Sequence, residues 1–160
     1  MRSLLLVAFL FFVVAASHAH AQVVRLAPDF SYQGVGTKAS TLKGLRGQPV
    51  VLIITDSPKN WDFKKQVGNL KFQYQEFANK QVIFVAAFTK EAGPIKSNIP
   101  VVTANDGGAV ASAYGAQGKF TIAIIGKDGN LDYQTRKVLS SARVNDVIQN
   151  SYAVQSVTGR

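Results

Sequence analysis

Three short runs of apolar, mostly β-branched residues constrain the fold of this chain more than any other feature. They are Val50–Ile54, Val82–Phe88 and Thr121–Ile125. Because each run is short and almost free of polar side chains, it is typical of a central strand that is covered on both faces. The sequence therefore predicts three buried strands of one sheet.

An amphipathic segment separates the first two runs. Its apolar residues recur at alternating spacings of four and three, as on one face of a helix. They are Phe63, Val67, Leu70, Tyr74 and Phe77. Strand, helix and strand in this order form a βαβ unit with a parallel pair of strands, so we expect an α/β domain.

The start of this helix has two candidate signals. Ser57 is a suitable N-cap, and Pro58 suits the first helical position because its missing N–H has no partner there. We therefore expect Ser57 to cap the helix.

Further elements follow the βαβ unit. We expect a short helix over Ala109–Tyr114, a hairpin turn at Gly126–Gly129 that leads into a strand over Leu131–Thr135, and a last helix over Ser141–Ala153. No linker or repeat interrupts this order. The sequence predicts one domain over residues 22–154 and a flexible tail over 155–160.

The first 21 residues have the pattern of a signal peptide. Arg2 is followed by the apolar stretch Leu4–Ala16 and by a small-x-small site at Ala19–Ala21. The stretch is shorter than the roughly 20 residues that a membrane-spanning helix needs. We expect cleavage near Ala21 and export to the periplasm or the extracellular space; an uncleaved membrane anchor is the alternative.

Several reactive side chains are absent after this leader. The chain has no cysteine, its only methionine is Met1, and its two histidines are His18 and His20. Thiolate nucleophiles, imidazole bases and the usual nitrogen and sulfur metal ligands are therefore missing. The sequence predicts no catalytic residue, no cofactor and no metal site.

The chain is basic, with a formal net charge of +9. Such a balance favours acidic partners such as polyanionic polysaccharides or lipid head groups, although a merely solvated basic surface is the simpler interpretation. Nucleic acid is not expected, because the basic residues are dispersed and are not interleaved with aromatic residues for stacking. A membrane is expected as a partner only through an uncleaved leader or through surface charge.

Five segments resemble the redoxins, the peroxiredoxin-like and membrane-anchored thiol–disulfide oxidoreductase-like proteins with a thioredoxin fold. The segments are Ala27–Phe30, Thr41–Leu52, Ile99–Val102, Val110–Gly118 and Gly126–Gly129. This resemblance spans about Ala27 to Leu139. It implies a thioredoxin-like fold, with a mixed central sheet flanked by helices and preceded by a redoxin-type N-terminal extension.

The resemblance also locates what is missing. Where the family carries its redox Cys-x-x-Cys, this chain has Ser57-Pro58-Lys59-Asn60, and where a cis-proline usually faces that motif it has Lys119-Phe120. Thiol–disulfide exchange and peroxide reduction both need the thiolate. Ser57 has no histidine to activate it, so these positions are read as vestigial and the chain as a degenerate, redox-inactive member.

A shorter match points to a second group. The strand that begins near Phe120 and its Gly-Lys-Asp-Gly turn resemble a cysteine-poor thioredoxin-like domain of extracellular-matrix proteins with sushi repeats.

The first functional hypothesis is a binding or adaptor module for an anionic ligand or an envelope or extracellular protein. Ligands of open α/β sheets bind at the carboxyl ends of the strands, so the expected contacts are Asp56, Lys59, Trp61, Lys64 and Phe120. Free N–H groups at the helix start could hold the anion. Trp61 is read as a half-buried lid on the core in preference to an exposed anchor.

Two alternatives stay open. One is an antioxidant or oxidoreductase with cysteine-independent chemistry, for which only carboxylates could serve as acid or base; the other is a structural or oligomeric envelope protein. The carboxylates are Asp29, Asp56, Asp62, Glu76, Glu91, Asp106, Asp128, Asp132 and Asp146. No pair has a spacing that places it in one cleft, and Asp106 and Asp128 lie in turn-like contexts.

Overall fold

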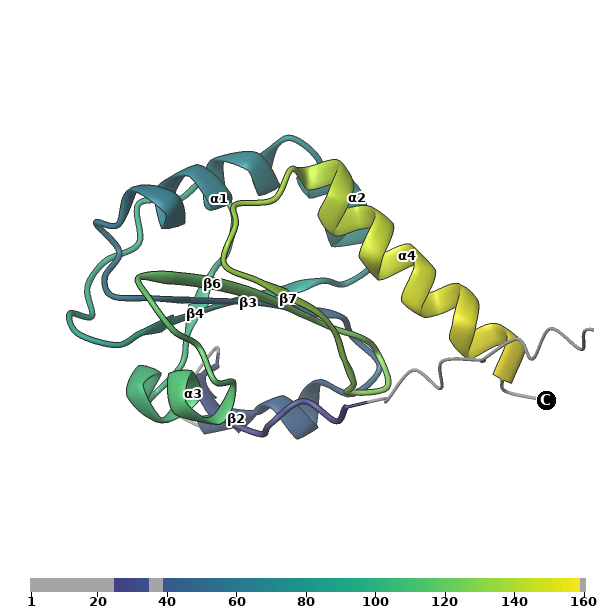
Figure 1. The fold of residues 1–160 in the computed structure, drawn as a ribbon. Coiled ribbons are helices and arrows are strands. Elements are labelled where there is room, and N and C mark those ends of the chain that lie inside the picture. Colours follow the sequence, from purple (N-terminus) through teal and green to yellow (C-terminus); the bar gives the residue numbers. More distant parts are fainter. Residues whose placement is uncertain (1–24, 35–38, 159–160) are drawn as a thin grey trace, which may run out of the picture.

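The fold was examined in a computed structural model, which describes residues 25–34 and 39–158. The expected signal peptide lies outside the described residues. The core of the fold is a five-stranded sheet in the order β5-β4-β3-β6-β7 (Figure 1). Its strands are β3 (Val50–Thr55), β4 (Ile83–Phe88), β5 (Val102–Thr103), β6 (Phe120–Ile125) and β7 (Leu131–Thr135).

The sheet is mixed, as the sequence predicts. β3 pairs in parallel with β4 and antiparallel with β6, and the hairpin of β6 and β7 is antiparallel. Every residue of β3 and of β6 is buried. The three apolar runs therefore form β3, β4 and β6, the three interior strands of the sheet, where both faces are covered.

Two layers cover the sheet (Figure 1). One face carries α1 (Trp61–Lys71), α2 (Tyr74–Asn79) and α4 (Ser141–Thr158), and the other carries α3 (Gly107–Ala113) and the 3-10 helix η1 (Leu42–Leu45). Alternate residues of the strands enter two core clusters, one under each layer.

The expected long helix over Phe63 to Phe77 is two helices. α1 ends at Lys71 and α2 begins at Tyr74, since the backbone leaves helical geometry at Gln73, where φ is −123° and ψ is 27°. Phe72, beside this break, is 85% exposed. The apolar spacing continues across this break, so the periodicity of the sequence does not reveal the break. The last helix is longer than expected: residues 155–158 continue α4 instead of forming a tail.

A buried amide joins α1 to the segment before α4. Gln66 Nε2 donates to Leu139 O at 3.1 Å, and Leu139 N donates to Gln66 Oε1 at 2.7 Å. Both ends of the side chain are thus satisfied inside the core, as a buried polar group requires.

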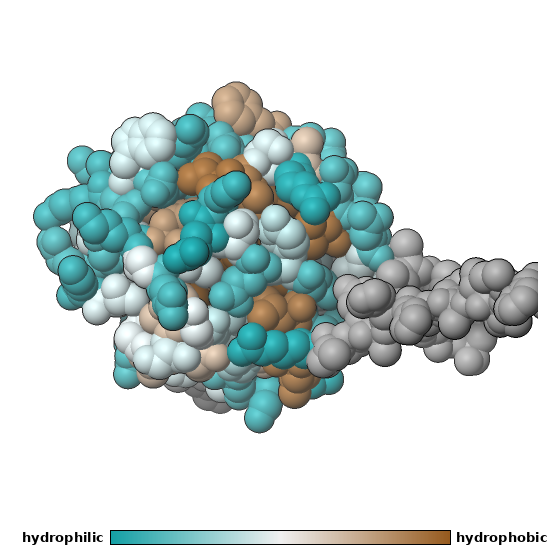
Figure 2. Space-filling view, viewed as in Figure 1, coloured by the Kyte–Doolittle hydropathy of each residue, from teal (hydrophilic) through white to brown (hydrophobic). Residues whose placement is uncertain are grey.

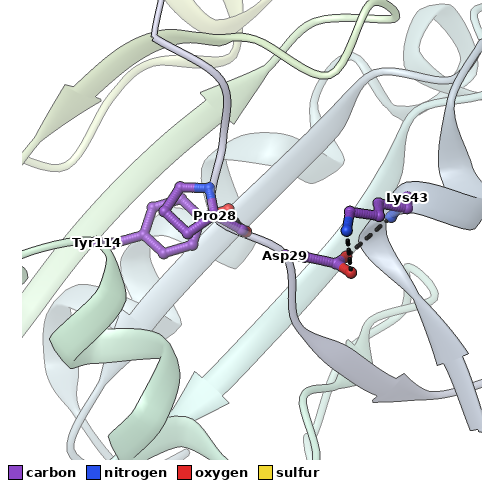
Figure 3. Close-up of polar contacts among 4 residues, drawn as sticks. All are labelled: Pro28, Asp29, Lys43 and Tyr114. Atoms are coloured by element: carbon purple, nitrogen blue, oxygen red, sulfur yellow. Dashed lines mark hydrogen bonds and ion pairs between the residues drawn. The ribbon is translucent and has the colours of Figure 1, made fainter.

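The N-terminal extension packs on the face of the sheet opposite α1. It contains the hairpin of β1 (Ser31–Gln33) and β2 (Ala39–Thr41), followed by η1. Tyr114 Oη donates to Pro28 O at 2.9 Å, while Asp29 accepts from Lys43 N at 3.0 Å (Figure 3). These contacts connect three of the redoxin-like segments, Ala27–Phe30, Thr41–Leu52 and Val110–Gly118. Across the described ranges, the helices are too short or too polar to cross a membrane.

Candidate functional site

The segment at the position of the redox motif is a turn between β3 and α1. Asn60 N donates to Ser57 O at 3.2 Å. The Asn60 side chain caps α1, since its Oδ1 accepts from Asp62 N at 2.8 Å and from Phe63 N at 3.2 Å. The prediction that Ser57 is the cap is therefore wrong: the helix begins at Trp61, after a turn that the sequence alone does not reveal.

The same side chain connects the turn to the segment before β6. Asn60 Nδ2 donates to Asp56 Oδ1 at 2.9 Å and to Lys119 O at 3.3 Å. Thr55 Oγ1 also donates to Lys119 O, at 2.9 Å. The structure thus brings together the two segments that correspond to the redox motif and to its facing proline, because Thr55 pairs with Phe120 across the sheet.

Asp56 accepts hydrogen bonds from Asn60 and Thr55, and among the described residues it forms no ion pair. Its pKa is lowered, chiefly by the hydrogen bond from Asn60, with a smaller contribution from Thr55 that burial opposes. A carboxyl group with a lowered pKa is ionised near neutral pH, so Asp56 cannot supply a proton there. It is suited to holding the turn and unsuited to acid catalysis.

Phe120 differs from the expectation. Its side chain is only 4% exposed and belongs to the core cluster under α1 and α4. The prediction of a contact through Phe120 is wrong, because the first residue of a central strand points into the core. Its neighbour Lys119 is exposed.

Trp61 also differs from the favoured interpretation. The side chain is 68% exposed at the first position of α1, and Lys65 Nζ lies 4.6 Å from the centre of its ring. It is therefore an exposed aromatic residue and not a half-buried lid. Residues one turn apart on a helix surface meet in this way, and the cation adds a small attraction to the ring.

The helix start cannot hold an anion as expected. Asn60 already occupies the N–H groups of Asp62 and Phe63, and Asp62 places a negative charge in the first turn. Lys59, expected to assist, forms an ion pair with Glu91 at 2.9 Å. Groups of the chain itself therefore occupy the N–H groups of Asp62 and Phe63 and the ammonium group of Lys59.

A groove of about 690 Å³ runs beside α1. One wall is the flank of α1 with Pro58 and Lys59, and the other is the loop after β4, residues 91–98. Phe63, Val67 and Pro94 supply apolar surface. Sequence reasoning missed this groove, because the loop has no periodic pattern and only its proline and glycine residues mark it as a loop.

The groove is strongly basic. Its lining contains the lysines Lys59, Lys64, Lys71 and Lys96, and Glu91 is its only acidic residue. Lys59 pairs with that glutamate, whereas within residues 25–34 and 39–158 the other three lysines have no ion-pair partner. Of the contact residues expected from the sequence, Lys59 and Lys64 line the groove; Asp56 and Trp61 do not.

Three of the carboxylates have structural partners. Asp29 pairs with Lys43, Asp106 caps α3 through the N–H of Ala109, and Asp128 accepts from Asn130 N. In the part of the chain that the structure describes, no three acidic, histidine or cysteine residues gather where they could hold a metal ion.

No protein-family model and no curated protein matches the chain. Several solved structures do. A thiol:disulfide interchange protein from Bacteroides sp. has a TM-score of 0.64 at 16% identity, covering 81% of this chain and 90% of its own.

Two further structures come from other bacteria. The exposed lipoprotein thioredoxin of Streptococcus pneumoniae has a TM-score of 0.59 at 19% identity, covering 77% of this chain and 99% of its own. Peroxidoxin BcpB of Mycobacterium tuberculosis has a TM-score of 0.58 at 18% identity, covering 82% and 96%. Like these proteins, the chain has a thioredoxin-like fold, and it carries that fold without a cysteine.

Proposed function

We propose that this protein is an exported, redox-inactive binding module that holds an anionic ligand in the lysine groove beside α1. The observation that carries the proposal is the groove itself, where Lys64, Lys71 and Lys96 surround apolar surface and have no ion-pair partner among the described residues. A ligand with carboxylate or sulfate groups would gain charge-assisted hydrogen bonds there.

The missing sulfur chemistry supports a binding role over an oxidoreductase role. Asn60 stands at the second cysteine position of the redox motif and uses its amide to cap α1 and to hold Asp56 and Lys119. A fold can keep its architecture after its chemistry is lost. The segment that carries the redox motif in the family here holds the start of α1, and α1 forms one wall of the groove.

Export is part of the proposal. The leader pattern over residues 1–21 supports it, and one structure of the same fold is that of an exposed lipoprotein. In a periplasmic or extracellular setting, sulfated glycans and acidic protein segments are accessible anionic ligands. The groove is therefore to be tested against both.

Isothermal titration of the chain from Gln22 onward with heparin fragments and with poly-glutamate tests the binding. That chain retains both core clusters, whose first residue is Ala27. At least one of the two polyanions should bind. The double variant Lys71→Gln, Lys96→Gln should bind that polyanion about tenfold or more weakly than the parent does. Lys137→Gln, which removes a charge outside the groove, should leave it unchanged.

Two results would contradict the proposal. The first is the absence of heat with either polyanion, or equal weakening by the groove and control variants. The second is turnover by the same cysteine-free protein in a peroxide-reduction or insulin-reduction assay, which would restore the oxidoreductase alternative.

A further inference from the structure

The outer face of α1 carries two exposed aromatic side chains that do not line the groove. Exposed large hydrophobic residues in the described part of the chain are Leu26, Trp61 and Phe72, and two of these three lie on this helix. Trp61 is its first residue and Phe72 its C-cap. Single exposed apolar residues are ordinary. These two are distinguished by lying on one line of α1, a helix that also carries three lysines.

Helical geometry places the two rings on the same line. Trp61, Lys65, Gly68 and Phe72 follow one another at intervals of four, three and four residues, so they form a single stripe. The buried residues Phe63 and Leu70 lie on the opposite side of α1. The stripe therefore points directly away from the sheet, and its two aromatic ends stand about 16 Å apart along the axis.

Positive charge accompanies these rings. α1 carries Lys64, Lys65 and Lys71 against the single acidic residue Asp62. Within the described ranges, Lys64 and Lys71 have no ion-pair partner, and Lys65 lies over the Trp61 ring. Figure 2 shows apolar surface at the top of the molecule, in the layer of α1 and α2, with hydrophilic surface around it.

We propose that this stripe docks the protein on an anionic lipid surface, with α1 parallel to the membrane plane. The exposed rings of Trp61 and Phe72, together with three lysines on α1, suit a surface that is anionic at its face and apolar beneath it. Trp and Phe side chains can enter the interfacial region while lysines contact acidic head groups. This surface shares Lys64, Gly68 and Lys71 with the wall of the groove, whereas Trp61, Lys65 and Phe72 do not line the groove.

The chain provides its own probe, because Trp61 is its only tryptophan. The test uses the chain from Gln22 onward, which lacks the apolar leader. Vesicles of phosphatidylglycerol mixed with phosphatidylcholine should shift the Trp61 emission to shorter wavelength and sediment the protein. Vesicles of phosphatidylcholine alone, or high salt, should abolish both effects, because salt screens the attraction to the head groups.

Variants separate the stripe from other surface features. Phe72→Ser keeps the Trp61 probe and removes a ring that makes no core contact, so it should weaken vesicle binding by about tenfold without altering the melting temperature. Lys65→Gln should weaken it as well. The matched controls are Leu26→Ser, which removes an exposed apolar residue (55% exposed) outside α1, and Lys137→Gln; both should bind as the parent does.

Three results would overturn the proposal. One is an unchanged Trp61 emission with anionic vesicles. Another is equal vesicle binding by Phe72→Ser and the parent. The third is a shift with poly-glutamate that matches the shift with vesicles and does not need Phe72, which would assign the face to an acidic protein. Lys96→Gln distinguishes the two proposals, since it alters the groove and leaves the stripe intact.

Discussion

Asn60 is bonded through both ends of its amide. Its oxygen accepts from two N–H groups at the start of α1, and its nitrogen donates to Asp56 and to the carbonyl of Lys119. One side chain thus fixes the end of β3, the start of α1 and the approach to β6. A position that lies within the redox motif of the family has a structural role here.

Replacing this residue should lower stability. We expect Asn60→Ala to reduce the free energy of unfolding by about 1–2 kcal/mol, because the helix loses its cap and Asp56 loses its strongest hydrogen bond. Urea denaturation measures the change. Asn98→Ala, at an exposed loop position, is the control, and an equal loss in both variants would show that Asn60 has no special role.

Asp132 is a second residue with an unusual environment. Among the described residues, one of its carboxylate oxygens, Oδ2, is buried without a hydrogen-bond partner, and the charge of Asp128 acts on the carboxyl group. Burial is the largest cause of a raised pKa, the Asp128 charge adds to it, and a hydrogen bond with Ser151 acts in the opposite direction. The folded protein therefore binds the Asp132 proton more tightly than the unfolded chain does.

The raised pKa of Asp132 determines the direction in which its contribution to stability changes with pH. The favourable contribution of protonated Asp132 is complete below the ordinary pKa of 3.8 and is lost as pH rises through the raised value. We expect Asp132→Asn to have a higher melting temperature than the parent at pH 7, and the difference to shrink on acidification. Thermal melts across that pH range measure it, and a less stable variant at pH 7 would refute the assignment.

At the scale of the elements, two helical glycines have opposite surroundings. A Cβ built on Gly107, the first residue of α3, would lie 2.1 Å from the carbonyl oxygen of Phe88 at the end of β4. A Cβ on Gly68, within α1, would meet nothing within 4 Å. The absence of a side chain lets α3 approach β4, whereas in α1 it has no packing purpose that the structure shows.

Alanine at these two positions should therefore act in opposite directions. Gly107→Ala should cost about 1–3 kcal/mol, because the contact is with backbone that cannot turn aside. Gly68→Ala should raise stability by about 0.5–1 kcal/mol through its higher helix propensity. Chemical denaturation of both variants compares them, and a loss of stability at Gly68 would show a packing constraint that the structure does not contain.

At the scale of the whole molecule, the strands were the most predictable part. Val50–Ile54 and Thr121–Ile125 are long enough and apolar enough that burial on both faces decides their structure. The break between α1 and α2 was not predictable, because Tyr74 and Phe77 keep the helical spacing beyond it. The spacing of apolar residues shows which face of a helix or strand is apolar. It does not show where the backbone leaves one element and enters the next.

The site was predicted less well for a related reason. Lys59 and Lys64 were recognised from their place beside α1, but their groove needs Lys96 from a loop without periodicity. The exposure of Trp61 and the burial of Phe120 depend on how β3, β6 and α1 meet. Contacts between segments far apart in the sequence, such as Asn60 with Lys119, leave no trace in either segment alone.

The central position of β3 has a consequence for how the chain reaches this structure. One neighbour, β4, ends at Phe88, but the other, β6, begins only at Phe120. Until β6 has been synthesised, the edge of β3 that pairs with β6 has no partner. β3 has six residues, and none of them is charged. Unpaired apolar edges recruit other chains, so we expect this protein to be more prone to aggregation before β6 has paired with β3 than afterwards.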